Sequence, residues 1–295
     1  MKEKPYVKVA MYALNIIFAI IIIVPVIYCF NVSMMDLKEI YGGKFWPSHL
    51  TIENYTRAFQ LAPFFTFIKN SLIVSGVITF AQVVTGALAA YAFAMMEFKG
   101  KKVLFYIMLA TMMIPSQAII IANYLTIADW GIRNTYAALI LPNAAAAFAV
   151  FNMRQAFLTL PKEIHEAAEI DGAGIFKIFY KIILPTCTPI LATVAIFSAV
   201  GQWNNYQDTL IYITDQKLYS LQYLLYTYIN QASSLAAMVR NSGTAAISTA
   251  ALATQQTGTS IQMTVSVVVV LPILCIYPMF QRFFVKGIMI GSVKG

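Results

Sequence analysis

Charged residues are scarce in this chain. Only 11% of its 295 residues are Asp, Glu, Lys or Arg, whereas 60% are hydrophobic and the mean hydropathy is +0.72. A soluble domain carries roughly 25% charged residues, so the composition excludes an ordinary soluble domain and places most of the chain in lipid. The formal net charge of +8 therefore does not indicate nucleic-acid binding, because basic residues beside membrane helices orient the chain in the bilayer.

Cysteine pairs and phosphate-binding motifs are also missing. The three cysteines, Cys29, Cys187 and Cys275, lie in or beside apolar runs, and none belongs to a Cys-x-x-Cys pair. This pattern argues against a disulfide framework and against a zinc site. The sequence contains no Gly-x-x-x-x-Gly-Lys-[Ser/Thr] loop for nucleotide phosphates. We therefore expect no metal, cofactor or catalytic residues in this chain.

Long apolar runs are abundant by contrast. A membrane-spanning helix needs about 20 mostly apolar residues, and six segments approach that length, at residues 9–30, 71–96, 103–124, 136–152, 187–203 and 260–280. Pro115 and Pro142 lie inside the third and fourth segments, where a proline removes a backbone bond and bends the helix. The sequence thus predicts an all-α membrane protein with six transmembrane helices.

Lysine and arginine are unevenly distributed between the loops. Of the 20 basic residues, 13 lie in the segments 1–8, 97–102, 153–186 and 281–295. Because the positively charged side of a membrane protein faces the cytoplasm, we expect both termini there. The expected parts are residues 1–30 with the first helix, an extracellular segment 31–70, a core 71–281 with helices two to six, and a cytoplasmic tail 282–295. The core includes a cytoplasmic loop 153–186 and an extracellular loop 209–258, with a short helix expected near residues 219–230.

The cytoplasmic loop contains a spaced pattern. It begins with Glu166-Ala167-Ala168 and continues with Asp171-Gly172-Ala173. Nine residues separate Gly172 from the final part, Ile182-Ile183-Leu184-Pro185. Pro161 suits the first turn of a helix, and Gly172 stands where helices often end in a left-handed turn. We predict a short docking helix over residues 162–171, with Glu166 free to form a charge-assisted bond. An ordinary amphipathic loop helix is the alternative.

This pattern resembles the coupling loop of the membrane subunits of ATP-driven (ABC) importers. The Asp171-Gly172-Ala173 extension is similar to the carbohydrate-uptake, maltose-transporter-type branch. The pairs Asn54-Tyr55 and Asn70-Ser71 and the tail QRFFVKGIMIGSVKG also resemble that branch. The tail is most similar to permeases for oligosaccharides derived from complex polysaccharides.

The resemblance implies a type I ABC importer permease fold in a bacterial plasma membrane, moving a sugar, expected to be an oligosaccharide, by alternating access. It implies four partner chains: a second homologous permease in a heterodimer, two ABC ATPase subunits that bind ATP and Mg, and an extracellular sugar-binding protein. The residues it assigns to ATPase coupling are His165, Glu166, Ala167, Ala168, Asp171, Gly172 and Ala173. In the tail, Gly287, Gly291 and Gly295 are expected to approach the ATPases, with a disordered end as the alternative.

Aromatic and amide side chains gather at the outer end of the fifth apolar segment. The candidates for the substrate path are Trp203, Asn204, Asn205, Tyr206 and Asp208. Such groups suit a polyhydroxylated ligand, although an interfacial aromatic belt would use them too. An ion-coupled carrier usually has ionisable residues inside its spans, and these span interiors have none. That rival, and a non-transporting scaffold, are less well supported than an import permease.

Overall fold

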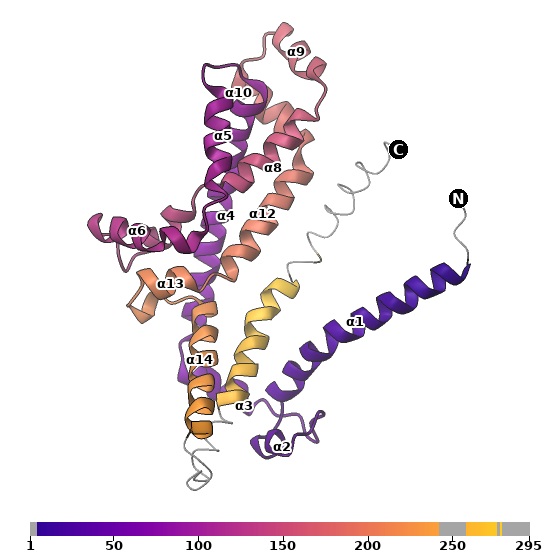
Figure 1. The fold of residues 1–295 in the computed structure, drawn as a ribbon, viewed down its shortest axis with the longest axis vertical. Helices are drawn as coiled ribbons and strands as arrows, with labels where there is room; N and C mark the ends of the chain where they lie inside the picture. The colour runs from indigo at the N-terminus through magenta and orange to yellow at the C-terminus, as the bar shows by residue number, and fades with distance from the viewer. Residues whose placement is uncertain (1–4, 242–257, 276–277, 279–295) are drawn as a thin grey trace. The chain divides into compact units, whose positions relative to one another are not determined.

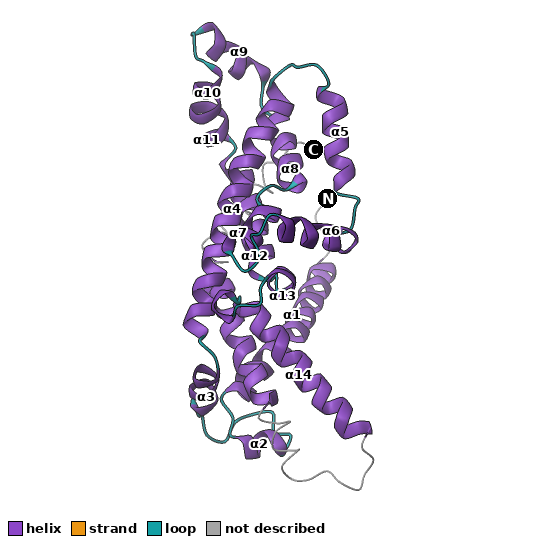
Figure 2. Ribbon diagram, turned by 90° about the vertical axis from the view of Figure 1, so that its left-hand side faces the viewer, coloured by secondary structure: helices purple, strands orange, loops and turns teal. Residues whose placement is uncertain are grey.

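The computed structural model describes residues 5–241, 258–275 and 278, which are drawn as coloured ribbon in Figure 1. Over these residues the chain is helical and contains no strand (Figure 2). A helix pairs its backbone groups within its own segment, as a chain in lipid requires. The chain divides into two units, one from Met1–Phe64 and Leu224–Pro272 and the other from Phe65–Tyr223 and Ile273–Gly295.

Among the described residues, three helices are long and apolar enough to cross a membrane alone. They are Tyr6–Ser33 within α1 (Pro5–Ser33), Phe64–Met95 (α4) and the C-terminal helix Gly258–Cys275. Three bent pairs meet the same criterion when both members are counted together: Lys101–Thr111 (α5) with Ser116–Asp129 (α6), Tyr136–Asn143 with Ala147–Leu158 (α8), and Ile175–Thr186 with Thr188–Trp203 (α12). Six spans result only if each bent pair is one span.

Prolines account for two of these bends. The break between α5 and α6 is 98° and ends at Pro115, and the break before α8 is 41° and follows the 3-10 turn Leu141–Asn143 (η1), which contains Pro142. Both bends were predicted from the sequence. The 78° bend at Cys187, between Ile175–Thr186 and α12, was not. The expected fifth apolar segment, 187–203, is thus only the second half of a longer bent pair.

Several predicted boundaries were wrong. The helix α4 begins at Phe64 instead of residue 71, and α1 continues to Ser33, so residues 34–63 separate these two long helices. In the expected loop 153–186, α8 continues to Leu158 and further helix follows from Ile175, so the segment between them is 159–174 and contains one short helix at Lys162–Ile170. The predicted helix near 219–230 exists and is longer, as α14 (Leu221–Asn241).

The first unit is tied together by one buried asparagine. It contains α1, the short helix α2 (Leu37–Tyr41), α3 (Glu53–Leu61), the part of α14 from Leu224 and most of the C-terminal helix. The Nδ2 of Asn54 donates to the carbonyls of Ser33 (3.1 Å) and Met35 (2.8 Å), and its Oδ1 accepts from Oγ of Ser260 (3.1 Å). One side chain therefore joins α3 to the end of α1 and the start of the C-terminal helix.

The larger apolar cluster of the second unit includes the contact between α4 and α8. Small residues of α4, among them Ala87 and Ala90, are buried there together with Ala149 and Met153 of α8. A Cβ placed on Gly86 would lie 3.1 Å from Cβ of Ala149, so the two helices approach as closely as small residues allow. The small-residue face of α4 thus packs within this chain.

Another asparagine ties the start of α4 to the segment before α14. Asn70 is buried, its Nδ2 donates to the carbonyls of Lys217 (2.8 Å) and Tyr219 (2.9 Å), and its Oδ1 accepts from the hydroxyl of Tyr136 (2.6 Å). The neighbouring Ser71 hydroxyl accepts from the backbone N–H of Leu221 (2.9 Å). These contacts explain why polar residues lie inside a helix here: their partners come from about 150 residues further along the chain.

We predict that Asn70→Ala lowers the free energy of unfolding by about 1–3 kcal/mol, because it leaves buried carbonyls and a hydroxyl without partners. Thermal unfolding of the purified chain would measure the loss. Asn152→Ala is the matched control, since the Asn152 amide bonds only to the Phe148 carbonyl of its own helix (2.8 Å). Equal effects of both substitutions would contradict the assigned role of Asn70.

Candidate functional site

The helix α9 (Lys162–Ile170) carries the spaced pattern and ends in a defined turn. Pro161 precedes it in extended conformation, and Gly172 follows with φ +72°. The N–H of Gly172 donates to the Glu169 carbonyl and the N–H of Ala173 to the Ala168 carbonyl, both at 3.0 Å. This pair of bonds is a Schellman motif, which satisfies carbonyls at the end of a helix. The predicted left-handed stop at Gly172 is confirmed.

One face of α9 is attached to the core of the second unit. Ala168 is buried in the same apolar cluster as the α4–α8 contact. The hydroxyl of Tyr91 on α4 and Nε2 of His165 form a hydrogen bond of 3.1 Å, and the Tyr91 ring lies 5.1 Å from that of Phe179. Nδ1 of His165 lies 3.7 Å from Oε1 of Glu169. His165 and Ala168 therefore hold the helix in place from its inner side.

The opposite face of this loop is exposed. Glu166, Ala167 and Asp171 lie there, as a surface that docks a partner requires. Two large apolar side chains flank the turn: Ile170 is 86% exposed and Phe176, in the next helix α10 (Ile175–Ile178), is 71% exposed. Both side chains are therefore accessible to a partner on either side of the turn. Sequence reasoning missed both residues, although their place on either side of Gly172 was a usable signal.

We predict that Gly172→Ala destabilises this turn by about 1–2 kcal/mol, because a side chain is strained in the left-handed region. A Cβ at Gly172 meets nothing within 4 Å, so the cost is confined to the backbone. Hydrogen exchange of the amides of Gly172 and Ala173 should become faster. Gly174→Ala is the control, since Gly174 has φ −68° and equally open surroundings; faster exchange in both variants would refute the strain argument.

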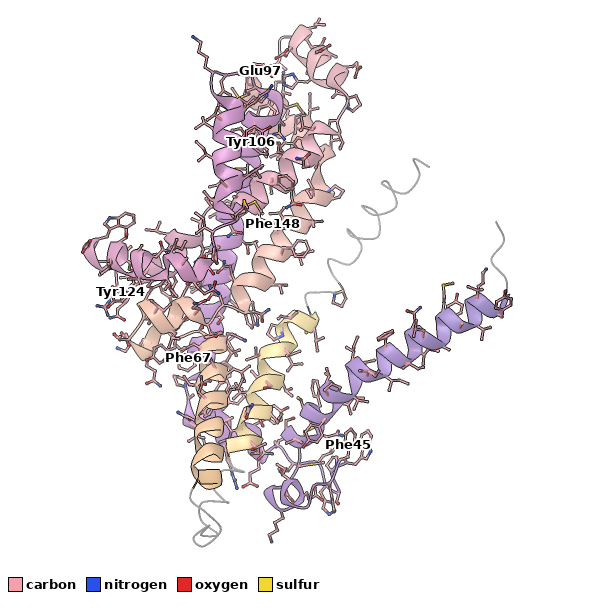
Figure 3. The ribbon with its side chains drawn as sticks, in the orientation of Figure 1. Phe45, Phe67, Glu97, Tyr106, Tyr124 and Phe148 are labelled. Atoms are coloured by element: carbon pink, nitrogen blue, oxygen red, sulfur yellow. The ribbon has the colours of Figure 1, made fainter. Side chains whose placement is uncertain are left out.

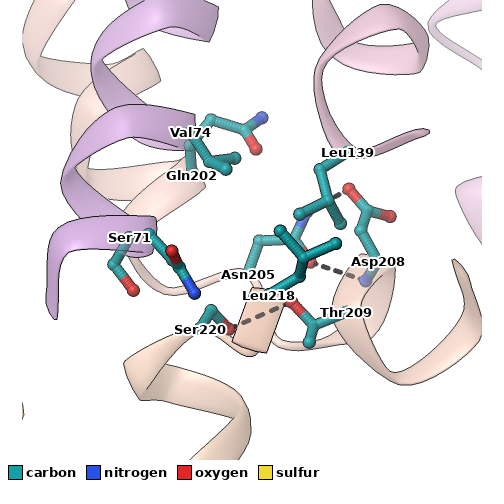
Figure 4. Close-up of a pocket in the computed structure, with 10 residues that line it drawn as sticks. Ser71, Val74, Leu139, Gln202, Asn205, Asp208, Thr209, Leu218 and Ser220 are labelled. Carbon is teal, nitrogen blue, oxygen red and sulfur yellow. Dashed lines mark hydrogen bonds between the residues drawn. The ribbon is translucent and has the colours of Figure 1, made fainter. Parts of the chain in front are cut away.

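The five candidates for the substrate path do not form one site. Trp203 is buried at the end of α12, whereas Asn204 and Tyr206 are exposed. Only Asn205 and Asp208 point into a common pocket, which Figure 4 shows between the ends of α4, α7 (Tyr136–Ile140) and α13 (Gln207–Tyr212). The five side chains that lie together in the sequence are thus separated by the structure.

Asp208 belongs to a hydrogen-bonded cluster around the break in the fourth apolar segment. Its Oδ2 accepts from Nδ2 of Asn143 and from Nδ2 of Asn205, both at 2.7 Å. Gln82 of α4 donates to the Asn143 carbonyl (2.7 Å). Burial raises the pKa of Asp208, and the two amide hydrogen bonds oppose that shift. These hydrogen bonds join α13, η1 and α4 and hold the three elements together.

The pocket beside Asp208 is too small for a sugar. Its cavity volume, counted for the centre of a water molecule, is about 20 Å³, which holds about one water. A larger pocket of about 310 Å³ lies between α6 and η1, within the range of small-molecule sites. Its lining includes Asn123, Thr126 and Trp130, which are separated in sequence from η1 and were not recognised as a site.

The tail glycines remain untested. Gly287, Gly291 and Gly295 lie outside the residues that the structure describes. The expectation that they approach an ATPase therefore stays a prediction from the sequence.

We predict that Asp208→Asn raises the unfolding temperature more at neutral than at acidic pH. A carboxyl whose pKa is raised by folding favours the folded state below its unfolded value of 3.8 and loses that contribution as the pH rises through the folded pKa. The amide oxygen of asparagine can still accept both bonds and has no charge. The gain over the parent protein should therefore shrink as the pH falls toward 3.8.

Thermal unfolding of both proteins across this pH range checks the expectation. Asp129→Asn replaces an exposed carboxylate at the end of α6 and controls for a general effect of removing negative charge. A pH-independent difference between Asp208→Asn and the parent would show that Asp208 is not held in a desolvated environment.

Comparison with known proteins adds to this geometry. Residues 82–290 match the family described as "Binding-protein-dependent transport system inner membrane component". The chain is 29% identical over 286 residues to the polygalacturonan/rhamnogalacturonan transport system permease protein YtcP of Bacillus subtilis (strain 168), covering 96% of both. It is 32% identical over 277 residues to Protein LplC of the same organism, covering 93% of this chain and 90% of the relative.

This chain is also similar to another sugar permease and to a chain of a solved structure. The arabinooligosaccharides transport system permease protein AraQ of Halalkalibacterium halodurans is 32% identical over 252 residues, covering 85% of this chain and 82% of AraQ. A chain in the crystal structure of a bacterial ABC transporter involved in the import of the acidic polysaccharide alginate superposes with a TM-score of 0.80, 23% identity and coverage of 96% of this chain and 98% of that one. At this identity the superposition shows a shared fold.

Proposed function

Because this chain belongs to the family of binding-protein-dependent transport system inner membrane components, we propose that it is the permease subunit of an ATP-driven importer of oligosaccharides. The printed names of several relatives support the substrate class, since they refer to polygalacturonan or rhamnogalacturonan, arabinooligosaccharides and melibiose, raffinose or stachyose. The chain is a multi-pass protein of the cell membrane.

One observation carries the coupling part of this proposal. The helix α9 is attached to the membrane core by its inner face, through Ala168 and the bond between Tyr91 and His165. The opposite, exposed face of α9 and the turn after it have large apolar side chains at Ile170 and Phe176. A rigid helix held on one side and open on the other can transmit a partner's movement to the spans.

We assign the partner at this face to an ABC ATPase. The sequence has no phosphate loop of its own, so another chain must hydrolyse ATP. Ile170 and Phe176 would fill an apolar cleft in that chain, and Glu166 and Asp171 would meet cationic or N–H groups at its rim. The proposed complex contains a second homologous permease, two ATPases with bound ATP and Mg, and an extracellular sugar-binding protein.

The proposed topology has six spans with both termini in the cytoplasm. Figures 1 and 2 show α9 and the α4–α5 turn at the same end of the second unit. The α4–α5 turn contains Lys99, Lys101 and Lys102. The helix α9 begins with Lys162 and is followed by Lys177. The excess of positive charge supports a cytoplasmic location for that end.

The proposed sugar path runs past the pocket between α6 and η1. Trp130 can stack on the apolar face of a sugar ring, while Asn123 and Thr126 offer hydrogen bonds to hydroxyl groups. In the alternating-access mechanism, closure of the ATPases draws the coupling helices together and opens the path outward. The sugar then leaves the binding protein, enters the path and is released inside after ATP hydrolysis.

We predict that Ile170→Asp abolishes ATP-driven oligosaccharide uptake, because a charge would replace the apolar side chain that enters the ATPase cleft. The variant should reach the membrane in normal amounts, since Ile170 is exposed and is not part of the core. Ile52→Asp, an equally large change at a residue 72% exposed before α3, should leave uptake intact. Full uptake by the Ile170→Asp protein would contradict the docking assignment.

Purification of the tagged chain from its native membrane in mild detergent tests the proposed assembly. Mass spectrometry should identify a second permease and an ATPase with a phosphate-binding loop. Recovery of the chain alone, under conditions in which a control importer stays intact, would favour an ion-coupled carrier or a non-transporting scaffold instead.

A further inference from the structure

A basic pocket lies where α4 turns into α5, away from the exposed face of α9. Its volume is about 700 Å³, and its lining includes Lys101, Lys102 and Arg154 together with the aromatic rings of Phe105 and Tyr106. Figure 3 labels Tyr106 on α5 and Glu97 in the turn after α4. Glu97 is the only acidic residue in the lining of this pocket. The pocket thus has an excess of positive charge beside aromatic walls.

Two of the three cations are held in fixed positions. The Nε of Arg154 donates to the Phe93 carbonyl (3.1 Å), and its guanidinium lies 4.1 Å from the ring centre of Phe105. The Nζ of Lys101 donates to the Met96 carbonyl (2.7 Å) and pairs with Oε1 of Glu97 (3.1 Å). Neither Arg154 nor Lys102 forms an ion pair with any residue that the structure describes. Both charges therefore remain available to an anion.

The start of α5 adds to this positive field. Its N-cap is Gly100, which has no side chain to accept a hydrogen bond, and its first turn contains no acidic residue. The unpaired N–H groups of a first helical turn carry partial positive charge and favour a nearby anion. The backbone N–H groups and the three basic side chains thus all favour an anion in this pocket.

An exposed apolar face continues from the pocket along α5. Val103, Tyr106 and Ile107 are between 58% and 66% exposed, and their spacing of three and four residues places them on one side of the helix. A ligand that fills both regions needs an anionic head and a long apolar portion. A phospholipid has this combination, whereas a free phosphate ion uses only the basic part.

We infer that this pocket binds the phosphate headgroup of an anionic phospholipid, with the acyl chains lying along the exposed face of α5. Basic pockets between membrane helices on the cytoplasmic side are suited to anionic headgroups. The chain's own tail is a poorer occupant, because residues 281–295 contain three basic and no acidic residues. This inference does not depend on which sugar is transported.

Such a lipid would act close to the coupling helix. Arg154 belongs to α8, and only residues 159–161 separate the end of α8 from α9. A headgroup that bridges Arg154 and Lys102 would fix α8 against the start of α5. The bound lipid would thereby stiffen the support on which α9 rests.

Lys102→Gln tests the inference in the full-length chain purified in detergent. Titration with dioctanoyl-phosphatidylglycerol, followed by thermal unfolding, gives an apparent dissociation constant. Removing one basic residue beside an anionic headgroup should weaken binding about fivefold. Lys99→Gln is the matched control, because Lys99 is an exposed lysine of the same turn that does not line the pocket; it should leave the constant unchanged.

Two further titrations separate the sources of the signal. Dioctanoyl-phosphatidylcholine and inorganic phosphate should each stabilise the chain far less than phosphatidylglycerol. Equal stabilisation by phosphate would overturn the lipid assignment in favour of a free-anion site. Equal weakening by Lys99→Gln and Lys102→Gln would overturn the pocket itself, and a photo-cross-linker at Tyr106 that captures a polypeptide in native membranes would show that a protein covers this face.

Discussion

The absence of water around the backbone governs this structure. A carbonyl or N–H that loses its helical partner in lipid must find another within the protein. At the break before α8, the Gln82 amide donates to the Asn143 carbonyl (2.7 Å) and the Thr85 hydroxyl to the Ala144 carbonyl (3.2 Å). Gln82 and Thr85 therefore permit this bend by satisfying the carbonyls that it frees.

The same constraint makes the second unit a suitable support for a moving part. Gly86 and Ala149 allow α4 and α8 to approach closely at one point, where a Cβ added to Gly86 would lie 3.1 Å from Cβ of Ala149. The helix α9 is attached to this pair through Ala168 and His165. A force applied to its exposed face would therefore reach α4 directly, which is what an importer driven by a separate ATPase requires.

The sequence predicted those features that depend on neighbouring residues. The apolar runs predicted the helices, Pro115 and Pro142 predicted two bends, and Gly172 predicted the left-handed stop. The sequence did not predict features whose hydrogen-bond partners lie far away along the chain. Asn70 looked like the start of a helix after a loop, but its bonds to Lys217 and Tyr219 bury it inside one.

The roles within the candidate sites were harder to predict for the same reason. The inward direction of His165 depends on Tyr91, which is 74 residues away. The cluster around Asp208 depends on Asn143, 65 residues away. No local pattern encodes either contact, so the sequence did not show which residues of the segment 162–173 hold it in place and which are exposed.

A photo-cross-linking amino acid at position 170 of the full-length chain, activated in native membranes, tests the central claim most directly. The account predicts a covalent product with an ABC ATPase, identified by mass spectrometry and absent when the same amino acid replaces Ile52. Products with lipid alone, or with a protein that has no nucleotide-binding loop, would contradict the claim that α9 couples this permease to ATP hydrolysis.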